Sequence, residues 1–284
     1  MRKPYITAPL ALALALALGV LGLTGCSAAE EEPVAGEQTS DEAVVIKVGA
    51  SPTPHAEILE QVVEDLAAEG FELEIIEYTD YVLPNTGVEA GEIDANYFQH
   101  TPYLDDFNAE NGTSIVSAAS IHFEPLGLYG GKTDAIDDLA DGAKIAVPND
   151  ATNEARALLL LEQEGLLTLK EGAGIKATVN DIAENPKNIE FVEVEAAAVP
   201  AMLADVDMAV INGNYALSAG ISVVDALAIE ASDGLAADTY ANIVAVAEGN
   251  ENDPGVQALV KALTSEKIRS FIEQEYNGSV VAVF

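Results

Sequence analysis

The stretch "KIAVPNDATNEARALLLLEQEG", residues 144–165, gives the clearest indication of the fold. Its first five residues form a short apolar run that is typical of a buried strand. Apolar residues then recur at helical spacing from near Thr152 to Gly165, a residue that tolerates the left-handed backbone with which many helices end. A strand that leads directly into a helix is the building unit of an α/β protein.

The same alternation continues on both sides of this stretch. Strands are predicted over residues 44–50, 73–78, 93–98, 114–123, 144–148, 189–194, 207–211 and 240–247. A helix is predicted from about His55, because Ile58, Leu59, Val62, Val63 and Leu66 recur at helical spacing. Two more helices close the chain. The pattern predicts an α/β protein with mainly parallel sheets.

The strand–helix series runs twice along the chain and returns at its end. We therefore expect two lobes joined by short crossings near Pro125–Gly130 and near Ala228–Asp238. The expected first lobe comprises residues 44–126 plus 231–284, and the expected second lobe comprises residues 127–230. Two lobes joined by two crossings form a hinge with a cleft between them.

The N-terminal segment has the features of an export signal. Two basic residues precede the apolar run Ala8–Val20, which is too short for a comfortable transmembrane helix. The run leads to "LTGC" (residues 23–26), which resembles a bacterial lipobox. We predict a lipoprotein signal peptide over residues 1–25 and a lipid anchor on Cys26. The alternative is an ordinary signal peptide followed by a chance cysteine.

The chain is strongly acidic. It has 12 basic and 48 acidic residues, and removal of residues 1–25 with their two basic residues leaves 10 − 48 = −38. Such a charge excludes nucleic acid and anionic lipid surfaces as partners. Residues 26–43 are polar and acidic and are predicted to be a disordered tether. A salt-rich habitat is a hypothesis for the remaining acidity.

The sequence offers little support for catalysis. "GLYGGKT" (127–133) has three residues between Gly127 and Gly131, where a phosphate-binding loop needs four before its Gly-Lys pair. No GxSxG motif is present. The three histidines, His55, His100 and His122, are predicted to be scattered rather than to form a zinc site. We expect no enzyme, no cofactor and no metal, and His122 receives no role.

Several stretches together resemble one known family. They are "PHAEIL" (54–59), "DYVLPN" (80–85), "GEIDANYFQHTPYL" (91–104), "IAVPNDATNEARALLLL" (145–161), "DIAENPKN" (181–188), "DVDMAVINGNYA" (205–216) and "YANIV" (240–244). In this order and spacing they are similar to the NlpA family of methionine-binding lipoproteins, the substrate-binding proteins of ABC importers. One departure is "AAAVPA" (196–201), where the family usually has "AAQLPR".

The resemblance implies a type II-like periplasmic-binding-protein fold. Each lobe would be a mixed, mainly parallel sheet flanked by helices, and the ligand would lie in the cleft between the lobes. The implied function is capture of L-methionine by a monomeric lipoprotein at the extracytoplasmic face of the cell membrane, either at the cell surface or in a periplasm. The implied partner is an ABC permease with a cytoplasmic ATPase.

The resemblance also implies which residues bind the amino-acid head group. Arg156 falls where the family has its carboxylate-binding arginine, in the first turn of the predicted helix, where the helix dipole favours an anion. Arg269, the other arginine of the mature chain, is expected on the surface. Asn212 and Asn242 match the positions of the family's binding amides, and Glu124 is the candidate partner of the ammonium group.

The side-chain pocket is expected in an aromatic segment. By resemblance, Phe98, His100 and Tyr103 form the pocket together with Tyr81. Aromatic rings suit a thioether, because its polarizable sulfur packs well against ring edges. The alternative is an aromatic core cluster, which would leave His100 in need of a buried partner. His55 is expected to have a structural role.

Other functions stay open at this stage. D-methionine, a methionine derivative, cysteine or a short Met-containing peptide would fit a similar pocket. A metal-binding receptor, a secreted hydrolase and a surface adhesin are alternatives of other classes.

Overall fold

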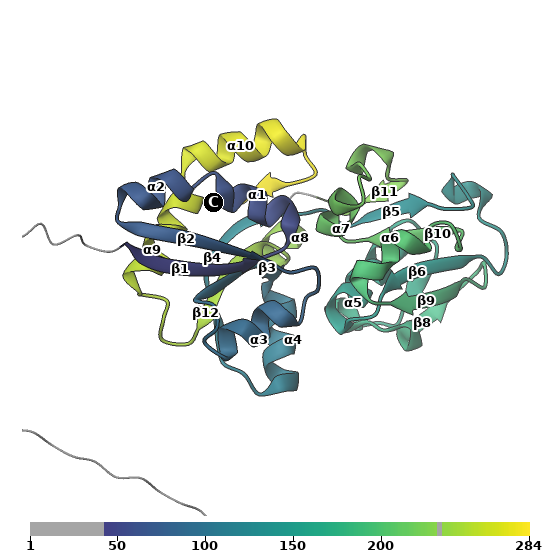
Figure 1. Cartoon of the computed structure of the whole chain (residues 1–284). Coiled ribbons are helices and arrows are strands. Elements are labelled where there is room, and N and C mark those ends of the chain that lie inside the picture. The colour runs from purple at the N-terminus through teal and green to yellow at the C-terminus, as the bar shows by residue number, and fades with distance from the viewer. Residues whose placement is uncertain (1–42, 232–234) are drawn as a thin grey trace, which may run out of the picture. The chain divides into compact units, whose positions relative to one another are not determined.

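The computed structural model describes residues 43–231 and 235–284 (Figure 1). The predicted signal peptide, Cys26 and the predicted tether up to residue 42 lie outside the described residues. The described chain is built around two large mixed sheets. We call the first sheet with its helices the first lobe, and the second sheet with its helices the second lobe.

The first sheet has six strands. Their order is β13 (Val281–Ala282), β4 (Ile115–Phe123), β12 (Asn242–Ala247), β3 (Ala95–His100), β1 (Val44–Ala50) and β2 (Phe71–Glu77). Strand β1 pairs in parallel with β2 and β3, whereas β12 pairs antiparallel with both β3 and β4. Because β12 runs opposite to β3 and β4, its first residue lies beside their last residues.

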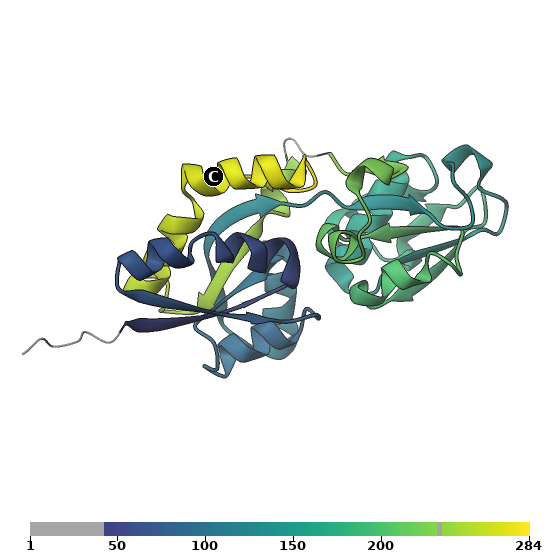
Figure 2. The same cartoon turned by 45° about the horizontal axis from the view of Figure 1, so that its top comes forward.

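Helices cover both faces of the first sheet (Figures 1 and 2). One face carries α1 (Glu57–Glu60), α2 (Val63–Ala68), α9 (Pro254–Leu263) and α10 (Glu266–Tyr276), and the other carries α3 (Leu83–Glu89) and α4 (Thr101–Asn111). The helix predicted from His55 is broken by a turn into α1 and α2, and an irregular turn, η1 (Pro52–Ala56), precedes it. Its predicted apolar positions are buried except for Val63.

The second sheet has five strands. Their order is β11 (Ala228–Ile229), β5 (Gly127–Gly130), β10 (Met208–Ile211), β6 (Lys144–Pro148) and β9 (Glu190–Val194). Strand β6 pairs in parallel with β9 and β10, and β5 pairs antiparallel with β10 and β11. Helix α5 (Ala151–Gln163) packs on one face, and α6 (Val199–Met202) and α7 (Gly213–Ser218) pack on the other.

Short elements complete the second lobe. They are the strand pair β7 (Thr168–Leu169) and β8 (Ile182–Glu184), with single turns at Ile136–Asp138, Gly174–Lys176, Val179–Asp181, Ala196–Ala198 and Val223–Asp225. Each lobe has its own apolar clusters, so each sheet is packed by its own helices.

The two stretches predicted to hold the crossings also contain short strands of the second sheet. In the stretch Pro125–Gly130, residues 127–130 form β5, so the first crossing is confined to the residues just before that strand. In the stretch Ala228–Asp238, residues 228–229 form β11 and α8 begins at Leu235. Both crossing segments add short antiparallel strands to the second sheet, and a pairing between segments so far apart in sequence leaves no local pattern.

The expected α/β class and the two-lobed fold are confirmed. The sheets contain more antiparallel pairing than the predicted "mainly parallel" pattern. The physical reason is that the strands next to the crossings, β5, β11 and β12, run against their neighbours. The predicted lobe boundaries, residues 127 and 230, stay a prediction.

Candidate functional site

One cavity gathers residues from both lobes and from the first crossing. Its lining residues are Tyr81, Phe98, Gln99, His100, Tyr103, Glu124, Asn153, Arg156, Asn212, Gly213, Asn214 and Asn242. It contains about 340 Å³ of space outside the protein atoms, part of which is open to solvent. Because its lining residues come from both lobes, a ligand bound in it would contact both lobes.

All eight residues predicted from the sequence to bind ligand line this cavity, and their binding roles stay predictions. The sequence did not single out four further lining residues, Gln99, Asn153, Gly213 and Asn214. Three of these four carry amide side chains. Asn153 and Asn214 each lie within three residues of a predicted binding residue, and that proximity is the only signal the sequence offered for them.

The arrangement follows from where strands end. His100 is the last residue of β3, Glu124 follows the end of β4, and Asn212 follows the end of β10. The register pairs Asn242, the first residue of β12, with His100 on one side and with His122 on the other. Ligand sites in α/β sheets commonly lie at such strand ends.

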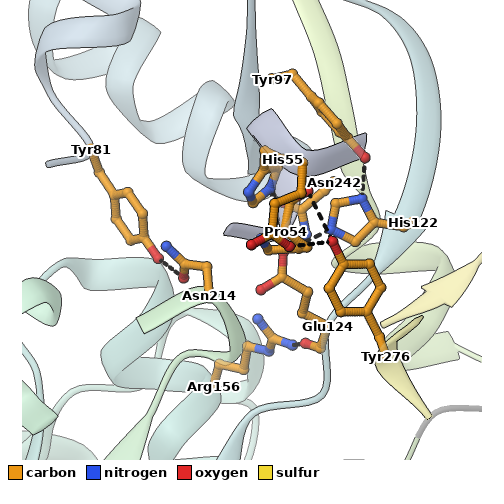
Figure 3. A network of polar contacts seen from close by, with 11 residues as sticks. Pro54, His55, Tyr81, Tyr97, His122, Glu124, Arg156, Asn214, Asn242 and Tyr276 are labelled. Atoms are coloured by element: carbon orange, nitrogen blue, oxygen red, sulfur yellow. Dashed lines mark hydrogen bonds and ion pairs between the residues drawn. The ribbon is translucent and has the colours of Figure 1, made fainter. Parts of the chain in front are cut away.

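Three rings form an aromatic wall on the first lobe. The ring centroids of Tyr81 and Phe98 lie 5.7 Å apart, those of Tyr81 and Tyr103 also 5.7 Å, and those of Phe98 and Tyr103 6.1 Å. The Tyr103 hydroxyl donates to the backbone oxygen of Tyr81 at 3.0 Å. The Tyr81 hydroxyl donates to Asn214 Oδ1 in the second lobe at 2.6 Å (Figure 3). The wall is therefore held in place by hydrogen bonds, one of which joins the lobes.

His100 has the buried partner that the sequence could not supply. Its Nδ1 accepts a hydrogen bond from the backbone N–H of Tyr103 and so caps α4. Its Nε2–H then donates to Asn153 Oδ1 at 3.2 Å, and the same oxygen accepts from Asn212 Nδ2 at 2.9 Å. Burial, with a smaller effect of Arg156, lowers the pKa of His100 to about 3, so the imidazole is neutral at physiological pH.

Arg156 lies one turn further along its helix than predicted. Helix α5 begins at Ala151, and its N-cap residue Asp150 accepts from the Asn153 N–H. Arg156 is therefore in the second turn, beyond the first turn in which the helix dipole favours an anion.

The Arg156 guanidinium already has protein partners. Its Nε donates to the two carboxylate oxygens of Glu230 at 2.8 and 3.0 Å, and its Nη2 donates to the same carboxylate and, at 2.7 Å, to the backbone oxygen of Glu124. The guanidinium carbon lies 4.5 Å from the ring centroid of Tyr240 and 5.5 Å from that of Phe123. Glu230 was not singled out from the sequence.

A buried polar cluster adjoins the cavity and shares Glu124 and Asn242 with its lining (Figure 3). His122 Nε2–H donates to Glu124 Oε1 at 2.7 Å, and His122 Nδ1 accepts from the Tyr97 hydroxyl. His55 Nε2–H donates to Asn242 Oδ1 at 2.9 Å and lies 3.3 Å from Glu124 Oε1. The prediction of scattered histidines is therefore wrong for His55 in η1 and His122 on β4, whose ring centroids lie 4.9 Å apart.

Burial sets the charges in this cluster. It lowers the pKa of His55 to about 4 and that of His122 to about 3, so both imidazoles are neutral at physiological pH. Burial raises the pKa of Glu124, with an opposing effect from His55 and Arg156. A positive group placed beside this carboxylate would favour its ionised form.

The same three side chains could hold a metal ion. Within residues 43–231 and 235–284, His55, His122 and Glu124 are the one group of three ligating residues whose donor atoms all lie within 4.8 Å of one another. The Nε2 atoms of both histidines are already occupied by hydrogen bonds.

Two buried polar atoms at the cavity lack partners. Among the described residues, Asn212 Oδ1 and Asn214 Nδ2 make no hydrogen bond although their residues line the cavity. Leaving such groups unpaired is costly, and ligand sites are a common reason for it. Asn212 Oδ1 can accept one hydrogen bond from a ligand, and Asn214 Nδ2 can donate to it, both from the second lobe.

Comparison with known proteins decides the family. The family model described as NlpA lipoprotein matches residues 46–284. The chain belongs to the NlpA lipoprotein family. Within the described part of this NlpA lipoprotein, no helix is long and apolar enough to cross a membrane.

Three relatives illustrate the similarity. The membrane lipoprotein TpN32 of Treponema pallidum is 43% identical over 88% of this chain and 91% of its own length. The D-methionine-binding lipoprotein MetQ of Escherichia coli is 36% identical over 93% of this chain and 94% of its own length. A nutrient-binding protein from Burkholderia cenocepacia, solved bound to methionine, superposes with a TM-score of 0.79 at 46% identity, over 84% of this chain and 100% of its own.

Proposed function

We propose that this NlpA lipoprotein is a receptor that captures free L-methionine in the cavity between its lobes and delivers it to an ABC importer. The observation that carries the proposal is the composition of the cavity. Its wall combines an arginine, a buried carboxylate, several amides and three aromatic rings. These groups match the carboxylate, the ammonium and the thioether chain of one small molecule.

Arg156 is the proposed partner of the ligand carboxylate. It lines the cavity, and, within the described residues, its Nη1 has no protein hydrogen-bond partner. The side-chain nitrogens of Asn214 and Asn242 also have none there and could donate to the same carboxylate. A carboxylate that loses its water needs several such donors.

Glu124 is the proposed partner of the ligand ammonium. It is the buried carboxylate of the cavity, and Asn212 Oδ1, an unpaired acceptor, lines the same cavity. Closure around the ligand would exclude water from both contacts, which strengthens them. The aromatic wall of Tyr81, Phe98 and Tyr103 is left for the thioether chain.

Methionine is proposed because of the relatives as well as the chemistry. The Burkholderia protein was solved with methionine, and the Escherichia coli relative is named for D-methionine. D-methionine, the enantiomer of the proposed ligand, is therefore the main alternative. A methionine derivative, cysteine or a Met-containing dipeptide would use the same head-group contacts.

Transport is proposed to involve no covalent chemistry. Each lobe contacts the same ligand, so binding favours the closed arrangement. A lipid on Cys26 would hold the monomer at the extracytoplasmic face of the membrane, beside its permease and cytoplasmic ATPase. The secreted-hydrolase alternative lacks a nucleophile paired with a base in this cavity as the described residues line it.

The test is to identify what the purified protein carries. A soluble form of residues 44–284 would be denatured and the released small molecules measured by mass spectrometry, followed by calorimetric titration with L- and D-methionine. We expect methionine in stoichiometric amount and tighter binding of the L-form. Another retained amino acid would change the specificity, and a protein that ignores all amino acids would contradict the receptor function.

The metal-binding receptor is a second candidate because of the His55–His122–Glu124 cluster. Elemental analysis of the same preparation tests it. Stoichiometric zinc that survives dialysis would favour it over the amino-acid receptor.

A further inference from the structure

Glu230 holds one edge of the Arg156 guanidinium. Its carboxylate accepts from Nε and Nη2, and both side chains are almost buried, with 12% of the Glu230 side chain and 5% of the Arg156 side chain exposed. Two N–H groups on the same edge, bound by one carboxylate, form the planar fork that fixes an arginine most firmly.

Glu230 also ties the two crossings together. Its backbone N–H donates to the Leu126 backbone oxygen at 2.9 Å, and its carboxylate accepts from the Leu126 N–H at 3.3 Å. Arg156 Nη2 donates to the backbone oxygen of Glu124, two residues before Leu126. The ion pair therefore lies at the point where the chain passes between the lobes.

These contacts leave a defined part of Arg156 for a ligand. The Nε hydrogen and both Nη2 hydrogens are engaged by Glu230 and by the Glu124 backbone. Contacts with the rings of Tyr240 and Phe123 restrict the plane of the guanidinium. The two hydrogens of Nη1 are the ones not engaged by the described residues.

We infer that Glu230 is a positioning residue for ligand binding: it holds Arg156 so that the ligand carboxylate meets the Nη1 end of the guanidinium. This inference rests on the proposed function. It also implies a net negative charge at the ligand cavity. The Arg156–Glu230 pair is neutral as a unit, so the remaining charge at the cavity is that of Glu124, which selects ligands with a free ammonium group.

The test compares two ligands in two proteins. Calorimetric titration of the wild type and of Glu230→Gln would use L-methionine and L-methionine amide, which keeps the ammonium and the side chain but lacks the carboxylate. We expect Glu230→Gln to bind methionine about tenfold or more weaker, the scale for hydrogen bonds to charged groups. Its affinity for the amide should be unchanged, because the amide does not need a positioned Arg156.

Two further variants make the result decisive. Glu230→Asp keeps the negative charge but places the carboxylate farther from Arg156. We therefore expect it to lose less methionine affinity than Glu230→Gln and to keep its affinity for the amide. This variant tests the inference even if Glu230→Gln folds poorly. Glu190→Gln removes an exposed acid that pairs with Lys144 in the same lobe, and it should leave both affinities unchanged.

Each failure has its own pattern. If both Glu230 variants lose equal affinity for methionine and for its amide, Glu230 has only a structural role. That result would overturn the inference but not the proposed function. Unchanged methionine affinity in both variants would overturn it in the same way. A wild-type protein that binds neither ligand would overturn the proposed function, and the inference with it.

Discussion

Arg156 is the proposed partner of the ligand carboxylate and also has a structural role. Its Nε and Nη2 donate to Glu230 and to the Glu124 backbone, and its Nη1 has no hydrogen-bond partner among the described residues. A buried guanidinium with these partners cannot be removed without leaving Glu230 buried and unpaired.

Arg156→Ala is expected to abolish most methionine binding and also to destabilise the fold. The loss of a buried ion-pair partner typically costs about 3–5 kcal/mol of stability. Titration calorimetry and urea unfolding would measure the two effects. Arg269→Ala is the control, because Arg269 packs on Phe284 away from the cavity lining. Near-normal methionine affinity in Arg156→Ala would refute the assignment.

As the proposed ammonium partner, Glu124 should make methionine binding depend on pH. Burial raises its pKa, so part of the carboxyl population becomes protonated at a pH above the range usual for glutamate. A ligand ammonium needs the ionised form. As the pH falls through the raised pKa of Glu124, methionine affinity should therefore fall, because binding must then release a proton.

Titrations from about pH 8 to pH 5 would measure this dependence, in a range where glutamate in water stays ionised. The Glu124→Gln variant should bind weakly, with no pH dependence over the same range. The three histidines should not contribute, because burial lowers the pKa of each of them to about 4 or below. A wild-type affinity that is constant down to pH 5 would argue against Glu124 as the ammonium partner.

At the scale of elements, α7 comes unusually close to the first crossing. Gly213, its first residue, has no room for a side chain: an added Cβ would lie 2.7 Å from Glu124 Cβ and 2.8 Å from Glu124 Oε2. The close approach brings Asn212 and Asn214 beside the proposed ammonium partner. Glycine is therefore needed here for space and not for an unusual backbone angle.

Gly213→Ala is expected to lower stability by about 1–3 kcal/mol, as overpacking does, and to weaken methionine binding by displacing Glu124. Gly255→Ala is the matched control. Gly255 also lies in the first turn of a helix, α9, but its added Cβ would meet the end of the Ile46 side chain in the first-lobe core. Equal affinity losses in the two variants would show that the effect is not local to the cavity.

The sequence predicted the long elements better than the short ones. Strand β1, which has seven residues, has the predicted bounds, 44–50, and β4, which has nine, begins one residue later than predicted. Strands β5 and β11 and helix α8 were missed, because four, two and five residues carry too little pattern and their pairing partners are distant in the chain.

The same limit applies to the site. Seven of the eight predicted residues lie in stretches that resemble the family, and Glu124 was a candidate because of its place at the first crossing. Glu230 could not be found this way, since it lies 74 residues from Arg156 and is one acid among 48. Contacts between distant segments depend on the register of the sheets, which the sequence does not display.

For the whole molecule, charge is the dominant feature. The net charge is −36, and its acidic groups repel one another more strongly in the compact folded state than in an expanded one. Among the described residues, several exposed ion pairs, such as Lys261–Glu69 and Lys267–Asp65, use basic residues that are already scarce. Salt should screen the repulsion more than it weakens these few pairs.

We therefore expect the free energy of unfolding to rise with added sodium chloride, since the screening length shrinks from about 10 Å at 0.1 M to about 3 Å at 1 M. Urea unfolding at the two salt concentrations would measure it. Sucrose, an uncharged stabiliser, provides the control for effects unrelated to charge. Stability that fell with added salt would contradict both this expectation and the hypothesis of a salt-rich habitat.

The hydrogen bond from the Glu230 N–H to the Leu126 oxygen joins two residues that are 104 positions apart. The segment between them carries Arg156 and Asn212, whereas the aromatic wall belongs to the rest of the chain. A segment whose two ends lie close together can be exchanged between related proteins without distorting the rest of the fold. Chimeras of related receptors could thus recombine the proposed carboxylate partner, Arg156, with a different aromatic wall, and so could natural recombination during evolution.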